Sequence, residues 1–213
     1  MTWTFDRELI GKQSGRVVDS KRFCAAIARI DQLNDEDPNR AALNGREVGY
    51  ELLFSVQLFA RVLDLAPNAS EGLMLAARSQ HICRWTSPRG DYPEGRTGYL
   101  KWRTNLKAFH ANKAAETLLE NGYDAATIDR VRNLNLKQDL HLNPECQALE
   151  DALCIVFLEK QFARFSEKTD EEKMVSILRK TWAKMSDAGR DLALTLPLEA
   201  PQKRLVEKAL ARA

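Results

Sequence analysis

Residues 51–65 read ELLFSVQLFARVLDL, and this stretch decides the fold class. Its apolar side chains Leu52, Val56, Phe59 and Leu63 recur at intervals of three and four residues, which is the spacing of one face of an α-helix. Similar spacing continues along most of the chain, whereas the alternation of apolar and polar residues that marks a strand is nearly absent. The sequence therefore predicts an all-α fold.

Short polar side chains mark the starts of the helices, because they accept hydrogen bonds from the free N–H groups of a first helical turn. The capping candidates are Asp19 or Ser20, Ser70, Asp124, Asn143 and Asp170. Together with the apolar spacing they predict helices over 20–33, 46–65, 70–85, 98–121, 125–137, 144–166, 171–188 and 201–212. Residues 86–98, TSPRGDYPEGRTG, are rich in proline, glycine and charge and are predicted to form a loop.

A chain of 213 residues with 44% hydrophobic residues is long enough for one sizeable core. No internal repeat period emerges along it. We therefore expect a single helical domain over 19–188, preceded by an N-terminal extension over 1–18 and followed by a C-terminal extension over 189–213 that contains the terminal helix.

Charge and cysteine content restrict the function classes. Thirty-two basic and thirty acidic residues give a net charge of +2, so no overall field draws the chain to nucleic acid or to a membrane surface. We expect a small anionic metabolite or nucleotide as partner and no membrane; nucleic acid is disfavoured, and a homo-oligomer stays open. The four cysteines form no C-x-x-C pair and residues 1–12 lack the apolar run of a signal peptide, which favours the reducing cytoplasm.

Several polar side chains lie on otherwise apolar faces of the predicted helices, where burial is costly unless the side chain has a partner. They are Glu51, Gln80, His81, His110, Glu150 and Asp151. Each alone is more typical of a hydrogen-bonded core residue, but histidines and carboxylates on the inward faces of four helices are together typical of a metal site. Imidazole and carboxylate suit Fe, Mn, Zn, Ni or Co better than Ca. The predicted ligands of a divalent transition metal are Glu51, His81, His110 and Asp151, with Gln80 and Glu150 as supporting or alternative ligands.

A competing interpretation of the same residues needs no metal. Arg84 follows His81 by three residues and Arg78 precedes it by three, so both lie about one helical turn away. Either guanidinium could form a salt bridge with Glu51 or Asp151 and so explain the buried acids.

The predicted loop and the start of the next helix carry basic side chains among aromatic ones, in PRGDYPEGRTGYLKWR (88–103). The basic side chains of interest are Arg89, Arg96, Lys101 and Arg103. A guanidinium makes paired hydrogen bonds to phosphate or carboxylate, so this segment could clamp an anion beside the metal. The alternative is an ordinary solvated loop.

Three segments resemble the HD-domain superfamily, helical metal-dependent phosphohydrolases whose ligands are a histidine, an adjacent His-Asp pair and a distant aspartate. The segments are GYELLFS (49–55), LMLAARSQHICRW (73–85) and ALEDALCIVFLE (148–159). The resemblance implies an HD-like bundle in which His110 matches the extra histidine of two-metal members. The chain departs from the pattern, because Glu51 replaces the first histidine and Gln80-His81 replaces the His-Asp pair, so only Asp151 matches in kind.

The chain also resembles an uncharacterised bacterial and fungal family, a domain of unknown function, some of whose fungal members carry the label glutamyl-tRNA synthetase. The resembling motifs include RFCAAIARID (22–31), AARSQHICRW (76–85), PRGDYPEGRTGYLKWR (88–103) and LEDALCIVFLE (149–159). The sequence shows no strand followed by a Gly-rich loop, which is the nucleotide-binding fingerprint expected of a synthetase. The label therefore implies little about activity.

From the polar residues and the HD resemblance we expect a metal-dependent hydrolase of a small phosphorylated metabolite or nucleotide. The metal would lower the pKa of a bound water, Glu150 would accept its proton, and Lys101 or Arg103 would meet the charge of the leaving group. The side chains expected to bind the ligand are Gln80, Arg84 and Arg89.

Two other functions stay open at this point. Some HD-like folds hold two irons and oxidise their substrates, although such a site needs more ligands than this sequence offers. A non-catalytic HD-like binding or scaffold protein would need no metal, and it would pair Arg78 or Arg84 with Glu51 or Asp151.

Overall fold

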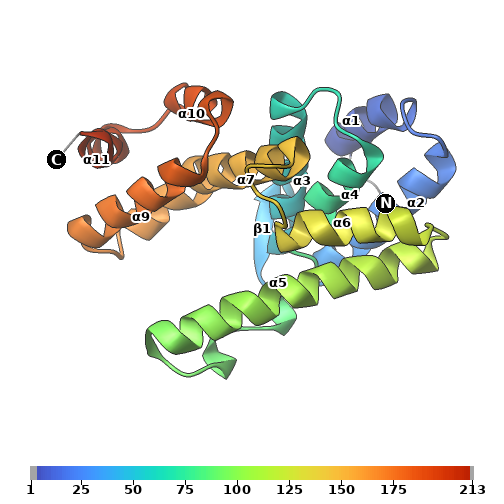
Figure 1. The fold of residues 1–213 in the computed structure, drawn as a ribbon, viewed down its shortest axis with the longest axis horizontal. Coiled ribbons are helices and arrows are strands. Elements are labelled where there is room, and N and C mark those ends of the chain that lie inside the picture. Colours follow the sequence, from blue (N-terminus) through green and yellow to red (C-terminus); the bar gives the residue numbers. More distant parts are fainter. Residues whose placement is uncertain (1–3, 212–213) are drawn as a thin grey trace.

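Helices form most of the structure, a computed structural model that describes residues 4–211, with side chains described from residue 8 (Figure 1). The α-helices are α1 (Thr4–Ser14), α2 (Ser20–Asp35), α3 (Tyr50–Leu65), α4 (Glu71–Ser79), α5 (Gly95–Glu120), α6 (Ala125–Leu136), α7 (Pro144–Val156), α8 (Phe162–Ser166), α9 (Glu171–Lys184), α10 (Asp187–Leu194) and α11 (Ala200–Leu210). The other elements are β1 (Arg40–Leu43), β2 (Arg46–Gly49), η1 (Arg84–Thr86), η2 (Arg89–Asp91) and η3 (Phe157–Gln161). None of the helices within the described range has the length and apolar content that a membrane crossing needs. The prediction of an all-α, single-domain bundle is confirmed.

A small hairpin interrupts the helices just before α3. Strands β1 and β2 pair antiparallel, with Arg40 opposite Gly49. Asn44 and Gly45 form the turn with φ values of 50° and 75°, a left-handed conformation that asparagine and glycine adopt most readily. Two predictions are therefore wrong: the helix predicted from residue 46 begins at Tyr50, and the chain contains two short strands. Asn-Gly is a known hairpin signal, but here it precedes a strongly helical segment.

Five of the predicted helix starts are confirmed by their caps, whereas the helices predicted from 46 and 98 begin at Tyr50 and Gly95. In these five helices the side chain before the first turn accepts a hydrogen bond from a backbone N–H group of that turn. These caps are Asp19, Ser70, Asp124, Asn143 and Asp170. The predicted ends agree less well: α4 ends at Ser79, and Cys83 then adopts a left-handed φ of 54° that an α-helix cannot contain.

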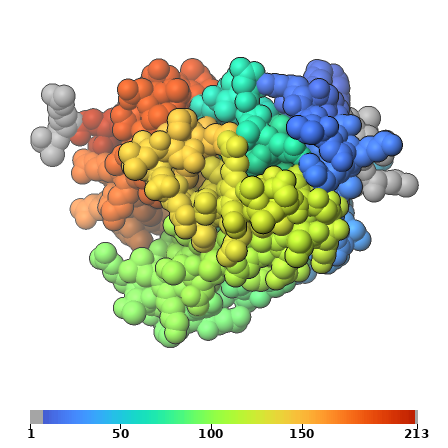
Figure 2. All heavy atoms as spheres, turned by 45° about the vertical axis from the view of Figure 1, so that its right-hand side comes forward, coloured from blue at the N-terminus to red at the C-terminus, as the bar shows by residue number. Residues whose placement is uncertain are grey.

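Two large apolar clusters and two small ones fill the interior of the described residues. The larger one joins α2, α3, α4, α6 and α7, and the second joins the end of α7 to α8, α9, α10 and α11. Figures 1 and 2 show the C-terminal helices (orange to red) on one side of the molecule and the N-terminal helices (blue) on the other. The C-terminal segment therefore contributes buried side chains, and α10, which begins at Asp187, spans the boundary predicted between 188 and 189.

A fully buried arginine ties α4 to α2. Arg78 has no exposed area; its Nε donates to Asp31 Oδ1 at 2.6 Å and its Nη2 donates to Asp31 Oδ2 at 2.7 Å. Paired hydrogen bonds of this kind satisfy both charges where water does not reach them. Arg78, one of the two arginines that the metal-free interpretation proposes as salt-bridge partners, thus pairs with Asp31.

The junction between α7 and α8 is a π-helical stretch, η3. Such turns are wider than α-helical turns and occur frequently at functional sites. Gln161, its last residue, donates from Nε2 to the hydroxyl of Tyr50 at 3.2 Å, which connects the junction to the start of α3.

Candidate functional site

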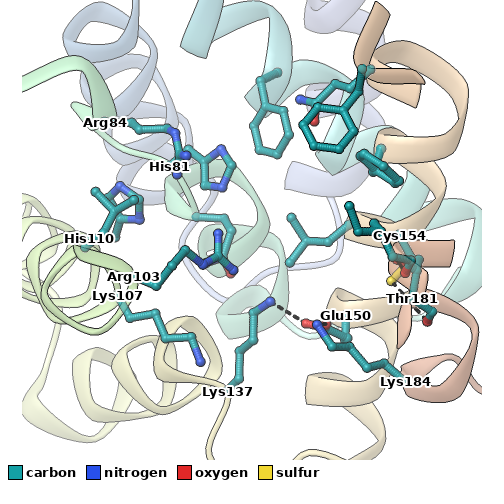
Figure 3. Close-up of a pocket in the computed structure, with 18 of the residues that line it drawn as sticks. His81, Arg84, Arg103, Lys107, His110, Lys137, Glu150, Cys154, Thr181 and Lys184 are labelled. Atoms are coloured by element: carbon teal, nitrogen blue, oxygen red, sulfur yellow. Dashed lines mark hydrogen bonds and ion pairs between the residues drawn. The ribbon is translucent and has the colours of Figure 1, made fainter. Parts of the chain in front are cut away.

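A cavity of about 340 Å³ lies where α3, α5, α7 and α9 meet (Figure 3). Cavities of this size are typical of sites for small molecules. Five basic side chains and one acidic side chain line it, namely Arg84, Arg103, Lys107, Lys137, Lys184 and Glu150. Aromatic side chains form much of the remaining wall, namely Phe54, Tyr99, Phe157 and Phe165. The cavity thus combines an excess of positive charge with apolar surface.

Helix α5 presents two cations to the cavity, one turn apart. Arg103 and Lys107 both line it, and neither makes a hydrogen bond or an ion pair with any residue that the structure describes. Burial lowers the pKa of Lys107, and the nearby charges of Lys137 and Arg103 lower it further. Cations without partners in a partly buried site favour an anionic ligand, because the ligand relieves their mutual repulsion.

Glu150 balances two other cations of the cavity. Its carboxylate forms ion pairs with Lys137 and with Lys184, the latter at 3.5 Å. Burial raises the pKa of Glu150, but the two ammonium groups outweigh burial and leave the pKa below its ordinary value. A carboxylate held in this way is a weak base, which argues against its predicted role as proton acceptor.

Two histidines form the opposite wall of the cavity in Figure 3. The ring of His81 stacks on Phe54 with centroids 4.0 Å apart, and its centroid lies 5.5 Å from that of His110. Glu51 contacts both His81 and Arg84: His81 Nδ1 lies 3.4 Å from Glu51 Oε2, and Arg84 Nε lies 3.7 Å from Glu51 Oε1. The structure therefore brings Glu51, His81 and His110 into one neighbourhood, as the sequence predicts.

Three side chains of this wall have buried polar atoms with no hydrogen-bond partner among the described residues. The atoms are Glu51 Oε2, Gln80 Oε1 and His110 Nε2. These side chains are only 5%, 4% and 2% exposed, respectively. Buried polar groups are nearly always paired, so an unpaired set of this kind indicates that water, an ion or a ligand completes it.

Burial sets the protonation of this wall. It raises the pKa of Glu51 to about 8 against the opposing effect of Arg84, and Asp37 raises it further. It lowers the pKa of His110 to about 3 and that of His81 well below its ordinary value, and Arg84 adds to both shifts. Both imidazoles are therefore neutral at physiological pH. Cys154, which also lines the cavity, is no thiolate nucleophile, because burial raises its pKa to about 12 and Glu150 adds to the shift.

The raised pKa of Glu51 predicts a pH-dependent stability. The folded state holds the proton up to about pH 8, whereas the unfolded chain releases it near 4.5, so folding stability decreases as pH rises between these values. We expect the stability of the wild-type protein, relative to Glu51→Gln, to fall from pH 5 to pH 8 and then to level off. Urea unfolding of both proteins across this range measures the difference, in which contributions that the two proteins share largely cancel. If the difference in stability rises with pH or stays constant, the pKa of Glu51 is not raised in the folded protein.

The unpaired amide of Gln80 predicts a substitution that does not harm the fold. Replacing a buried polar group that lacks a partner with an apolar group of similar shape is close to neutral or stabilising. We therefore expect Gln80→Leu to leave the free energy of unfolding unchanged or to raise it by up to about 1 kcal/mol. Chemical denaturation of the ligand-free protein measures this value. A loss above about 2 kcal/mol would mean that Gln80 has a partner in the folded protein.

Asp151 does not line the cavity, whereas the predicted ligands His81 and His110 do. Its Oδ1 accepts a hydrogen bond from Ser186 N at 2.9 Å and its Oδ2 accepts one from the Ser186 hydroxyl at 2.5 Å. Gln147 Nε2 donates to the same Oδ1 at 2.9 Å, and a Cβ placed on Gly189 would come within 2.6 Å of the Asp151 carboxyl carbon. Asp151 therefore holds the start of α10, and its neighbour Glu150 is the acid that lines the cavity.

The predicted anion clamp is only partly present. Arg84 and Arg103 line the cavity, but Lys101 is exposed on α5 and does not. Arg89 is used within its own loop, where it donates to the carbonyl oxygens of Tyr92 and Pro93. The loop segment is thus stabilised by Arg89, and helix α5 rather than the loop supplies the cations.

Three cavity cations were not among the predicted site residues. They are Lys107, Lys137 and Lys184. Lys107 follows Arg103 by four residues and precedes His110 by three, so helical spacing could have placed it on the same face. Lys137 lies just past α6 with a left-handed φ of 57°, and Lys184 ends α9, so neither position carries a periodic signal.

The predicted metal ligands do not form a metal centre as they lie here. In the part of the chain that the structure describes, no three or more His, Cys, Asp or Glu side chains are grouped to hold a metal ion. Arg84 contacts Glu51, and the charges of Arg84 and Arg103 act on His110, which opposes the binding of a second cation there. Metal binding by Glu51, His81, His110 and Asp151 therefore stays a prediction.

Comparisons with known proteins identify the family to which the chain belongs. No curated protein and no solved structure matches the chain. The family described as Domain of unknown function (DUF4202) matches residues 24–206, which include every residue that lines the cavity. The chain belongs to this family of domains of unknown function, DUF4202.

Proposed function

We propose that the protein binds a small phosphorylated metabolite or nucleotide in the central cavity and hydrolyses its phosphate ester. The observation that carries this proposal is the pair Arg103 and Lys107, which face the cavity without a partner among the described residues. Guanidinium and ammonium groups in a partly buried site bind phosphate through charge-assisted hydrogen bonds. The aromatic wall offers apolar surface for the organic part of the ligand. The resemblance to the HD-domain superfamily supports the hydrolytic part of the proposal.

The residues of the cavity match the needs of phosphate ester hydrolysis. Water that attacks phosphorus must lose a proton, and His81 and His110 stand at the cavity wall as its acceptors. Burial and the charges of Arg84 and Arg103 lower the pKa of both imidazoles, and a bound phosphate opposes these charges and so raises the basicity of the rings. Arg103 and Lys107 oppose the negative charge on the phosphoryl oxygens as the ester bond breaks. The leaving oxygen takes up a proton, for which the ammonium groups of Lys137 and Lys184 are placed at the cavity wall.

Two assays test this proposal. Isothermal titration calorimetry with inorganic phosphate and with a panel of phosphorylated metabolites and nucleotides measures binding, and release of inorganic phosphate measures turnover. We expect binding by the wild-type protein and phosphate release from at least one ester class. Binding that is absent for every phosphate compound contradicts the proposal. The same turnover assay with and without a chelator, together with the metal content of the purified protein, decides whether hydrolysis depends on a metal.

A second candidate function is a non-catalytic binding protein on the same scaffold. The contact between Arg84 Nε and Glu51 Oε1 favours it, because the metal-free interpretation of the sequence requires such a pair. This candidate predicts that phosphorylated compounds bind without any turnover. Either function would act in the reducing cytoplasm, for which the four free cysteines, Cys24, Cys83, Cys146 and Cys154, provide support.

A further inference from the structure

We propose that the ligand of the cavity is a phosphorylated polyol, such as a sugar phosphate, whose hydroxyl groups bind to Gln80 and His110. The inference rests on the proposed function, since it assigns the phosphate to Arg103 and Lys107. It adds a second recognition site in the same cavity, with its own chemistry and its own test.

The side chains of Gln80 and His110 line the cavity wall, and their polar groups form no hydrogen bond that would stabilise the fold within the described residues. Both line the cavity, both are more than nine-tenths buried, and neither makes a hydrogen bond with any described residue. The ring of His110 lies beside the rings of His81 and Phe109, at centroid distances of 5.5 and 5.8 Å. Polar side chains buried at this level are retained at a cost in stability, which a ligand can offset when it pairs with them.

The charges around these two side chains select a neutral partner. Arg84 and Arg103 lie close enough to His110 to disfavour its positive form, so an ammonium group of a ligand would meet the same repulsion. A carboxylate or a second phosphate offers no hydrogen to Gln80 Oε1, which is the amide atom left unpaired. A hydroxyl both donates and accepts, so it can satisfy an amide and a neutral imidazole together.

The spacing along α5 fits a compact ligand that reaches both sites. His110 lies three residues after Lys107 and seven after Arg103, which corresponds to about 5 to 10 Å along the helix axis. Leu106 lies on the same helix, between Arg103 and Lys107 in the sequence, and also lines the cavity. A carbon chain of a few atoms with a phosphate at one end and hydroxyls along it would span this distance and pack its C–H groups on the apolar wall.

Matched ligands test the inference in the wild-type protein. Glycerol 3-phosphate and ribose 5-phosphate carry hydroxyls, whereas propyl phosphate and pentyl phosphate present the same phosphate on apolar chains of similar length. We expect calorimetry to show about tenfold tighter binding of each hydroxylated compound than of its alkyl counterpart. Equal affinities, or tighter binding of the alkyl phosphates, would overturn the inference and leave phosphate binding in place.

Variants assign the preference to the two side chains. Gln80→Leu and His110→Phe are expected to bring the affinity ratio close to one while inorganic phosphate binds as in the wild type. Gln138→Leu, an exposed glutamine outside the cavity, is the control and should keep the tenfold preference. A preference that survives in both cavity variants overturns the assignment. If the wild-type protein binds none of these compounds or inorganic phosphate, the proposed function fails, and the inference fails with it.

Discussion

Replacement of Arg78 by leucine is expected to lower the free energy of unfolding by about 3–5 kcal/mol. The guanidinium has no exposed area and is held by both oxygens of Asp31, so the substitution leaves a carboxylate buried without its cation. Asp31 is itself only 6% exposed and cannot turn to water without moving α2. Urea denaturation followed by circular dichroism measures the loss.

Two further proteins separate the charge from the change of volume. Arg96→Leu, at an exposed arginine, is the matched control and should change stability by less than about 0.5 kcal/mol. The double variant Asp31→Leu with Arg78→Leu should recover part of the loss, because no unpaired charge then stays buried. If Arg78→Leu costs less than about 1 kcal/mol, the pair does not hold α4 on α2 as described.

Replacement of Lys107 by methionine is expected to weaken the binding of inorganic phosphate about tenfold or more, and Arg103→Met should act similarly. Both side chains face the cavity, and a hydrogen bond to a charged ligand contributes about 1.5–3 kcal/mol. Since neither has a partner among the described residues, stability should not fall, and Lys107→Met should relieve repulsion from Lys137. Calorimetry at low ionic strength measures affinity, and urea unfolding measures stability.

A neighbouring lysine on the same helix provides the control for this prediction. Lys101 is exposed and does not line the cavity, so Lys101→Met should bind phosphate as the wild type does. Equal losses in Lys101→Met and Lys107→Met would indicate a general effect of surface charge and would remove the case for a phosphate site on α5.

Local signals in the sequence were sufficient for the fold class and for most helix starts. A cap such as Ser70 or Asp124 acts within its own turn, so its effect depends only on the residues that follow. The hairpin was missed because its Asn44-Gly45 turn joins two strands of only four residues each. Such strands are too short for an alternation of apolar and polar residues to stand out. Local chemistry thus decides these elements, and the errors occur where an element is very short.

The candidate site was predicted in part, because helical faces can be read from spacing but their distant partners cannot. Glu51, His81 and His110 lie on apolar faces and meet, as their periodicity indicates. Glu150 and Asp151 are adjacent, about 100° apart on the helix, and both are buried. Which of them faces the cavity is decided by Ser186, which lies 35 residues away and binds Asp151.

The π-helical stretch η3 makes one wall of the cavity dependent on chain length. A π-turn contains one residue more than the α-turn it replaces, so deletion of one residue within 157–161 would let α7 and α8 run on as one regular helix. The side chains within the turn would then change position, and two of them, Phe157 and Gln161, line the cavity, whereas the side chains after the turn would keep nearly the same face of the helix. The shape of the cavity therefore depends on the one additional residue of the π-turn, and relatives that lack a residue within 157–161 should have a cavity of different shape.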